Sequence, residues 1–146
     1  MENQLNSDPV KQKIKLDFKN SKYATGRRKR SIARVWLKRG SGIIHVNGKK
    51  IADYFQKANL QNAVFRPLTL VKRENEFDVR CSVKGGGLSG QAGAIILGLA
   101  RAIVQFEPNL KSILKKEKLT TRDSRAVERK KYGRRKARRS FQFSKR

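Results

Sequence analysis

The last twenty-two residues of the chain, 125–146, contain eleven Lys or Arg and a single acid, Glu128. This segment has almost no apolar side chains, so burying its charges would cost more free energy than the buried surface could return. We therefore expect an extended tail that cannot fold on itself and that needs a polyanion to order it. At roughly 3.3–3.6 Å per extended residue, the tail could span about 70 Å.

The rest of the chain is also strongly basic, which again indicates a polyanionic partner. The 146 residues carry a net charge of +26 with a pI ≈ 11.2, and subtracting the tail's +10 leaves +16 on residues 1–124. A basic domain with a basic tail is typical of proteins that bind nucleic-acid phosphates. A membrane surface is disfavoured, because we find no apolar run of spanning length and no Lys-rich amphipathic helix with an aromatic face.

The sequence offers no candidate for catalysis or metal binding. Cys81 is the only cysteine, which excludes a disulfide framework or zinc cluster within the chain, and its alternation with apolar residues predicts a buried strand position. His45 is the only histidine, and we expect it on a strand surface or facing RNA. No catalytic residue, cofactor or metal is therefore predicted. Residues 1–22 are interpreted as a polar extension that lacks the features of a targeting peptide.

The first half of the domain is predicted from apolar periodicity. Period-two alternation predicts a strand over residues 31–38 with a basic outer face. A glycine-rich turn at 40–42 then predicts a hairpin with a second strand at 43–46. Helical spacing follows from Ile51, and we expect Pro67 to interrupt that helix.

The second half has the clearest signals. Strict alternation predicts a strand over residues 77–84, and one apolar stripe predicts a helix of about four turns ending at Phe106. A short helix is expected around Leu110. Apolar periodicity disappears past Leu119, so one domain is predicted over residues 23–124 with no second core.

A glycine-rich loop at residues 85–90 fits the dinucleotide spacing G-x-G-x-x-G between a strand and a helix. A nucleotide-dependent enzyme is therefore one hypothesis. It is weakened because Glu107 and Pro108 lead into another helix, where a Rossmann unit needs a strand that carries an acid, and because no P-loop Lys follows. A nucleic-acid phosphate fits the loop as well as a nucleotide does, since glycines permit close backbone approach and a helix N-terminus offers free N–H groups. A simple tight turn is the third interpretation.

Two further features favour RNA. Four consecutive cations at 27–30 precede the strand predicted at 31–38, and their density indicates contact with phosphates. In the tail, Tyr132, Phe141 and Phe143 are spaced among arginines. That spacing suits rings that stack on unpaired bases while guanidinium groups hold phosphates.

These same stretches resemble a known family, the ninth protein of the small ribosomal subunit. The likeness runs from about Tyr23 to the C-terminus and is highly specific. The matching segments are ATGRRK (24–29), KGGGLSGQAGAI (84–95), TRD (121–123), VERKKYG (127–133) and QFSKR (142–146).

The resemblance implies an α+β fold, a two-layer α/β sandwich with a mixed four-stranded sheet and helices on one face. It implies a place on the head of the small subunit, beside neighbouring ribosomal proteins, with the tail threading through ribosomal RNA towards the tRNA in the peptidyl site. Residues predicted to contact ribosomal RNA are Arg27, Arg28, Lys29, Arg30, Lys84, Gly85, Gly86, Gly87, Ser89, Gln91, Arg122, Arg125, Arg129, Lys130, Lys131, Tyr132, Arg134, Arg135, Lys136, Arg138 and Arg139. Those predicted to approach the tRNA are Ser144, Lys145 and Arg146.

Two departures from the family pattern limit this transfer. Ile96 stands where bacterial members usually have an arginine, so an RNA contact is not expected there. Phe141 replaces a common proline, and residues 138–143 look more like alphaproteobacterial and mitochondrial members. We expect a ribosome in a bacterial cytoplasm or an organelle. The alternatives to a ribosomal protein are the nucleotide-dependent enzyme and a free-standing RNA chaperone.

Overall fold

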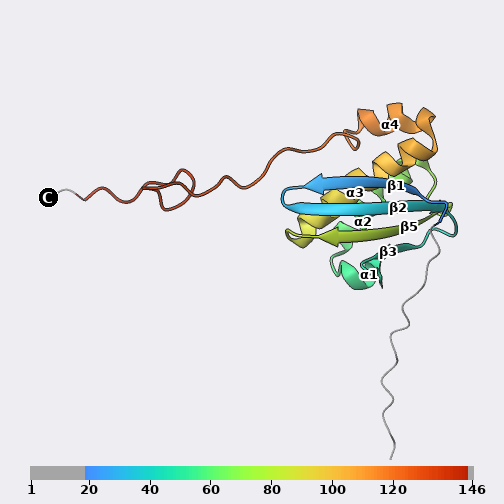
Figure 1. Cartoon of the computed structure of the whole chain (residues 1–146), viewed down its shortest axis with the longest axis horizontal. Helices are drawn as coiled ribbons and strands as arrows, with labels where there is room; N and C mark the ends of the chain where they lie inside the picture. Colours follow the sequence, from blue (N-terminus) through green and yellow to red (C-terminus); the bar gives the residue numbers. More distant parts are fainter. Residues whose placement is uncertain (1–18, 145–146) are drawn as a thin grey trace, which may run out of the picture.

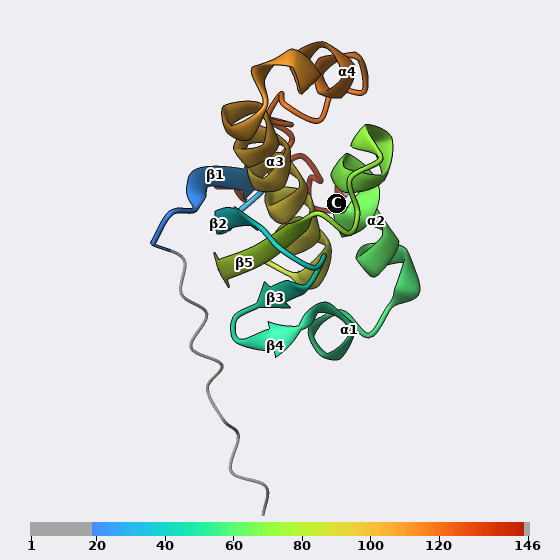
Figure 2. The ribbon, with the colours of Figure 1, turned by 90° about the vertical axis from the view of Figure 1, so that its right-hand side faces the viewer.

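The computed structural model describes residues 19–144 and shows one mixed sheet with helices packed against one of its faces (Figures 1 and 2). The expected N-terminal extension lies almost wholly outside the described residues, and the first strand begins at Lys22. The elements are β1 (Lys22–Arg28), β2 (Ser31–Arg39), β3 (Ile44–Val46), β4 (Lys49–Lys50), α1 (Ile51–Tyr54), α2 (Ala58–Val71), β5 (Phe77–Lys84), α3 (Leu88–Phe106), the 3₁₀ helix η1 (Pro108–Leu110) and α4 (Lys111–Lys116).

The sheet has the strand order β1-β2-β5-β3-β4. β2 pairs antiparallel with both β1 and β5, whereas β3 runs parallel to β5 and β4 returns antiparallel to β3. The predicted α+β class with a mixed sheet is confirmed. The sheet has five strands where four were expected, because Asn47 and Gly48 adopt positive φ angles of 51° and 81° and turn the chain into the two-residue β4.

The core lies between the sheet and α3. Alternate residues of β2 and β5 are buried, and α3 covers them with an almost continuous run of buried apolar residues. β1 contributes only small residues to this layer. A Cβ on Gly26 would lie 1.9 Å from the carbonyl oxygen of Ala94 and 2.4 Å from the amide nitrogen of Gly98, so the backbones of β1 and α3 are in direct contact. Figure 2 shows α3 and α2 on one side of the sheet, with no described helix over the other side.

β1 is the main element that the sequence pattern did not reveal. It pairs antiparallel with β2 along its whole length, from Lys22 opposite Leu37 to Arg28 opposite Ser31. Its buried positions hold only alanine and glycine, so it has no apolar alternation to detect. The basic cluster at 27–30 consequently forms the end and the turn of a β1–β2 hairpin, with Lys29 at φ 51°.

The predicted hairpin between residues 31–38 and 43–46 is wrong. β5 lies between β2 and β3, and the amide of Gly40 donates to the carbonyl of Glu76 at 2.8 Å as the chain crosses the end of β5. The amide of Val79 then donates to the carbonyl of Ile43 at 2.9 Å, which begins the parallel pairing. A short glycine-rich segment is compatible both with a tight hairpin turn and with a connection that crosses a neighbouring strand. The local sequence pattern therefore could not distinguish these two connections.

Pro67 does not interrupt its helix, contrary to expectation. α2 continues through it to Val71, and Pro67 is buried together with Val64 and Leu68 on one face. The packing of this face outweighs the single helix hydrogen bond that proline cannot donate. The helix ends at Lys72, which has a φ of 57°. The other predicted elements, β5, the long helix α3 and the short helix after Pro108, are confirmed.

Among the described residues, α3 is the one helix long and apolar enough to cross a membrane by length and composition. The most apolar 18 residues of α3 have a mean hydropathy of 1.3, and 56% of this stretch is buried inside the domain. The expectation that the sequence has no apolar run of spanning length is therefore wrong. The run is the central core helix of this fold, and its apolar residues cover the sheet.

The two singular residues have different outcomes. Cys81 is 2% exposed, and burial raises the pKa of its thiol to about 12, so the predicted buried strand position is confirmed. His45 was expected on a surface, but it is only 6% exposed and its Nε2 has no hydrogen-bond partner. His45 is buried because β3 lies between β5 and β4 in the sheet, and all three residues of this short strand are buried.

Candidate nucleic-acid interface

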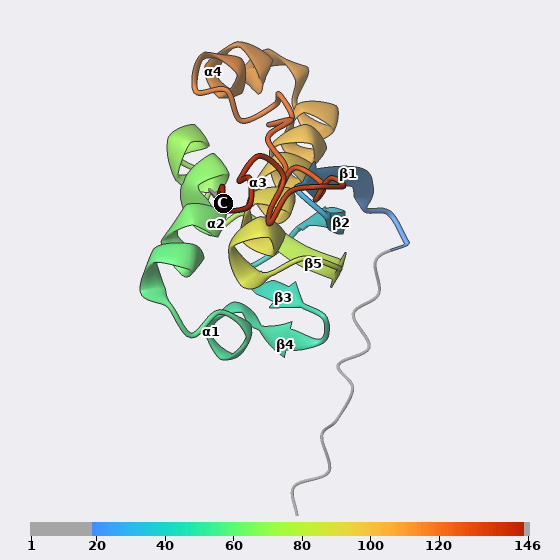
Figure 3. The same cartoon turned by 90° about the vertical axis from the view of Figure 1, so that its left-hand side faces the viewer.

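The basic cluster at 27–30 and the glycine loop at 85–90 are far apart in the sequence, but they meet at one end of the sheet. The β1–β2 turn contains Lys29 and Arg30, and the carbonyl oxygen of Arg30 lies only 2.7 Å from where a Cβ on Gly85 would be. Arg27, Lys29 and Arg30 are exposed, as is Lys84 at the end of β5. Figure 3 views this end of the molecule, from which the tail also departs. The structure therefore brings together predicted contacts from three separate segments.

The glycine loop is closed by contacts within the protein. Gly85 and Gly86 have φ angles of +74° and +64°, in the left-handed region that favours glycine. The hydroxyl of Ser31 donates to the carbonyl of Gly85 at 3.0 Å, and the side-chain amide of Gln91 donates to the same carbonyl at 3.2 Å. A Cβ on Gly86 would lie 2.1 Å from the hydroxyl oxygen of Ser31. The loop is thus a packed turn against β2 and not an open nucleotide cradle.

Gln91 also accepts a hydrogen bond from the hydroxyl of Tyr54 at 2.7 Å. Both ends of its side-chain amide are therefore bonded within the fold. Gly87 differs from its neighbours, because a Cβ there would meet nothing within 4 Å. It precedes Leu88 and Ser89, which are exposed at the first turn of α3, and the free N–H groups of that turn can face an anion.

A hollow of about 570 Å³ lies between β1, α3 and the segment that leads into the tail. Across it, the Arg28 guanidinium forms an ion pair with the carboxylate of Asp123. Hydrogen bonds from Arg125, with the charge of Arg28 adding to them, hold the pKa of Asp123 well below its usual range. The lining residues are Arg27, Arg28, Gly93, Ile96, Leu97, Lys118, Leu119, Thr121, Arg122 and Asp123.

Two sequence expectations bear on this hollow. Arg28, which was predicted to contact RNA, pairs with Asp123 within the protein, and its RNA contact stays a prediction. Ile96, which replaces the arginine usual in bacterial members, lines the hollow as an apolar wall. Arg27, Lys118 and Arg122 are the cations that remain at its rim without a carboxylate partner among residues 19–144.

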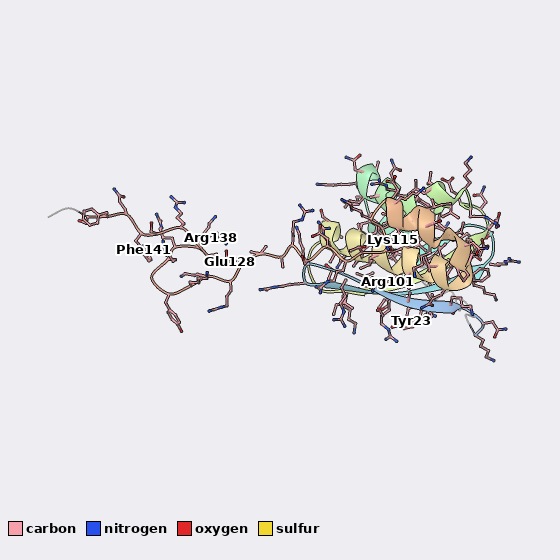
Figure 4. The ribbon with its side chains drawn as sticks, turned by 90° about the horizontal axis from the view of Figure 1, so that it is seen from above. Tyr23, Arg101, Lys115, Glu128, Arg138 and Phe141 are labelled. Atoms are coloured by element: carbon pink, nitrogen blue, oxygen red, sulfur yellow. The ribbon has the colours of Figure 1, made fainter. Side chains whose placement is uncertain are left out.

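The tail leaves the domain beyond this ion pair and runs away from it (Figures 1 and 4). It contains no helix and no buried residue in the described part, as predicted. Tyr132 is 97% exposed and Phe143 is 86% exposed, so neither ring has a place in the protein. The tail cations predicted to contact RNA lie along it, and all of them are exposed.

The tail contains one local loop, although it builds no core, as expected. The carboxylate of Glu128 pairs with Lys131 at 2.8 Å and with Arg138 at 2.9 Å, and these hydrogen bonds lower the pKa of Glu128. The amide of Arg135 donates to the carbonyl of Arg139 at 2.7 Å, which closes a turn without any core. The one acid of the tail therefore organises its nearest cations. Ser144 is the last described residue, and the predicted tRNA contacts Lys145 and Arg146 lie outside the described part.

Sequence reasoning missed a second group of residues on the sheet and on α3. Arg101 is exposed on α3, and it donates to the carbonyl of Thr25 on β1 at 3.2 Å. Figure 4 shows it on the same side of the domain as Tyr23. Neither residue could be placed while β1 was unrecognised. Arg34 and Trp36 were expected on a basic outer face, and the structure confirms that they alternate with the buried residues of β2.

Comparison with known protein families matches residues 26–146 to ribosomal protein S9/S16. The chain belongs to this family. The match includes the hairpin turn, the glycine loop, α3 and the whole tail, and excludes most of β1. Members of the S9/S16 family are structural proteins of the small ribosomal subunit and are not enzymes. The chain is accordingly an RNA-binding component of the ribosome that acts in translation. Its partners are ribosomal RNA and neighbouring ribosomal proteins.

Proposed function

We propose that the chain binds ribosomal RNA in the head of the small subunit through one end of its domain and through its tail. We propose further that the tail tip reaches the tRNA in the peptidyl site. The observation that carries this proposal is the convergence of the β1–β2 turn, the first turn of α3 and the start of the tail at one end of the molecule (Figure 3).

The domain end has the chemistry that phosphates need. Arg27, Lys29 and Arg30 are exposed, and within residues 19–144 no carboxylate pairs with them. Lys84 adds a further exposed cation beside the glycine loop. Charge-assisted hydrogen bonds from such groups to phosphate are about twice as strong as neutral ones. They position the protein on RNA without reading its sequence.

The tail supports the proposal because nothing within the described protein could order it. Ordering each residue costs roughly 1–2 kcal/mol in backbone entropy, and the described tail has no buried side chain to offset that cost. Its cations can offset it only by neutralising phosphates along an RNA path. The exposed rings of Tyr132 and Phe143 then find unpaired bases on which to stack.

The tRNA part of the proposal concerns Ser144, Lys145 and Arg146. Two cations follow Phe141 and Phe143, so rings held in ribosomal RNA would leave the tip free to touch a second RNA. Such contacts go to phosphates and act on every tRNA alike. The similarity of residues 138–143 to alphaproteobacterial and mitochondrial members supports a bacterial or organellar ribosome.

Deletion of residues 144–146 tests the tail tip. We expect small subunits that carry the shortened protein to assemble normally and to retain peptidyl-site tRNA less tightly, measured by filter binding across a salt titration. The matched control replaces Lys115 and Lys116 of α4 by glutamine, which removes two adjacent cations from outside the tail. Unchanged tRNA retention at every salt concentration, or failure of the particles to assemble, would show the proposed role of the tip to be wrong.

A free-standing RNA chaperone is the competing function for a basic, RNA-binding chain. Sedimentation of a cell lysate separates the two, because a subunit protein travels with small-subunit particles at physiological salt. Replacement of Lys29 and Arg30 by glutamine is expected to weaken incorporation into particles. The control pair Lys49 and Lys50 lies on the edge strand β4, away from the hairpin, and its replacement should leave incorporation unchanged.

A further inference from the structure

The face of the sheet that the helices leave uncovered carries exposed rings and cations. Residues that point to it alternate with the core residues of β1, β2 and β5. Tyr23 is 41% exposed and Ile32 is 45% exposed, although one is aromatic and the other apolar. We call this surface the open sheet face, and its central residues are Tyr23, Thr25, Ile32, Arg34, Trp36 and Arg80.

Strand register places Tyr23, Trp36 and Arg80 in one row, and Arg34 lies next to that row on β2. Tyr23 on β1 lies opposite Trp36 on β2, and Trp36 lies opposite Arg80 on β5. The ring centroids of Tyr23 and Trp36 are 5.4 Å apart with an interplanar angle of 43°. The guanidinium of Arg34 lies 5.7 Å from the centroid of Tyr23 and 5.2 Å from that of Trp36, while that of Arg80 lies 5.8 Å from Trp36.

These contacts preorganise the row. The Nε of Arg34 donates to the hydroxyl of Tyr23 at 3.2 Å, which orients the guanidinium without using its terminal nitrogens. Cation–π contacts hold Arg34 and Arg80 against the rings, so neither side chain must be ordered when a ligand arrives. Four side chains from three strands thus form a rigid platform of flat groups.

The charge on this face favours a polyanion over a protein surface. Arg34 and Arg80 have no carboxylate partner among residues 19–144. Asp78 is the acid at one corner of the face, and its Oδ1 accepts hydrogen bonds from the amides of Ser41 and Ile43 at 2.8 and 3.0 Å. That carboxylate is therefore occupied by the protein, and the cations of the face are free to meet phosphates.

We propose that the open sheet face binds a single-stranded segment of RNA, with an unpaired base stacked on the Tyr23–Trp36 pair and flanking phosphates held by Arg34 and Arg80. Exposed rings interleaved with arginines are the arrangement that binds single strands, because every base has a face that can stack. A duplex offers no free base to these rings. The proposal rests on the proposed RNA-binding function and adds a site that lies on a different face from the hairpin turn and the tail.

Trp36 makes the site directly observable. It is the only tryptophan of the chain, so intrinsic tryptophan fluorescence reports on the open sheet face alone. The full-length protein is titrated with a fluorescein-labelled twelve-nucleotide oligouridine, and anisotropy of the label follows total binding while Trp36 emission follows stacking at this face. We expect quenching of Trp36 by the single strand, and little quenching by a duplex RNA of the same length that raises anisotropy equally.

Substitutions identify the contacts. Tyr23→Leu keeps an apolar side chain and the reporter Trp36, and it should weaken binding measured by quenching about tenfold, in line with loss of one stacked base. Arg34→Gln should weaken it to a lesser degree and flatten its salt dependence. Arg39→Gln is the matched control, since it removes the same charge from the same strand, but Arg39 lies over the ring of Phe106 at 5.3 Å. It should leave quenching unchanged.

The outcomes separate this proposal from the proposed function. Anisotropy that rises while Trp36 emission stays constant would overturn the open sheet face as an RNA site and leave RNA binding by the tail intact. No rise in anisotropy would contradict the binding of single-stranded RNA both by this face and by the tail. Equal quenching by polyglutamate of matched charge would assign the face to an acidic protein segment instead. If Tyr23→Leu lowers the melting temperature, Arg34→Gln decides, because Arg34 is exposed and its loss removes no core contact.

Discussion

Asp123 links the domain to its tail through a single carboxylate. It pairs with Arg28 of β1 and with Arg125, which lies two residues further along the chain. The position from which the tail departs is therefore set by a contact between residues 95 apart in sequence. Because Arg28 also lies beside Gly93 of α3, the direction of the tail depends on the same close packing that holds β1 against α3.

Asp123→Asn is expected to release the start of the tail. Spin labels at Thr25→Cys and Ser140→Cys would report the distance between β1 and the tail by pulsed EPR, and native Cys81 is buried and should not react. The distance distribution should broaden in the variant. Asp53→Asn, a change at an exposed acid of α1, is the control and should leave the distribution unchanged.

The pH dependence of this link follows from the lowered pKa of Asp123. A carboxylate whose pKa is lower in the folded state contributes its stabilisation above its ordinary pKa of about 3.9, and loses it as pH falls through the folded pKa. The distribution should therefore be the same at pH 7 and pH 4.5, and should broaden only at more acidic pH. Broadening between pH 7 and pH 5 would assign the link to another group.

Gly26 is the residue that allows β1 to pack on α3. Gly26→Ala would place a methyl group 1.9 Å from the carbonyl oxygen of Ala94, a backbone atom that cannot turn aside. We expect the free energy of unfolding, measured by urea denaturation, to fall by about 1–3 kcal/mol or more. Gly87→Ala is the matched control because nothing lies within 4 Å of a Cβ there, and its effect should stay below about 1 kcal/mol.

At the scale of elements, Asp78 holds the crossing between β2 and β3. Burial alone would raise the pKa of Asp78, but hydrogen bonds from the Ile43 and Ser41 amides outweigh it and lower the pKa below its ordinary value. These bonds keep residues 41–43 against the end of β5, where β3 begins its parallel pairing. The element order of the sheet thus depends on a side chain of β5.

Asp78→Ala should reduce the free energy of unfolding by about 1 kcal/mol at pH 7, since the residue is only half-buried and its bonds compete with water. The lowered pKa means that the stabilisation is present above about pH 4 and is lost as pH falls through the folded value. Urea denaturation of the wild-type protein and the variant should therefore give a smaller difference at pH 3 than at pH 7. A difference that grows on acidification would contradict this role.

At the scale of the whole molecule, the domain and the tail have separate physical origins. The domain is stabilised by apolar burial between the sheet and α3, whereas the described tail buries nothing and carries a high density of like charge. Folding of the domain should therefore be independent of the tail. RNA binding, by contrast, should depend on both the domain and the tail.

Deletion of residues 125–146 is expected to leave the free energy of unfolding within about 0.5 kcal/mol of the full-length value, because no core contact is lost. The same deletion should weaken binding to a fragment of ribosomal RNA and flatten its salt dependence, with roughly 0.7 unit of slope lost per single-strand phosphate contact. Calorimetry and salt-dependent binding assays measure the two effects. A large loss of stability would mean that the tail packs on the domain.

Much of this fold and interface could be predicted from local signals. β5 and α3 have strong apolar periods, so their existence and buried faces were predicted correctly, and the loss of periodicity beyond Leu119 marked where helices and strands end. The basic tail needed no structure to be recognised, because like charges at this density exclude a core in any fold. The family followed from motifs that the glycine loop and the tail carry in sequence.

Tertiary structure alone decided what depends on contacts between distant residues. β1 has only Ala24 and Gly26 on its buried side, and it became a strand because α3 approaches it closely enough to need such small residues. β5 separates β2 from β3, which no local pattern shows. The ion pair between Arg28 and Asp123 could not be read from sequence, and Tyr23 meets Trp36 only once β1 is paired. The sequence by itself determined the periodic elements, the charge of the tail and the family, because these are properties of neighbouring residues. Pairings across 95 residues exist only in the folded chain.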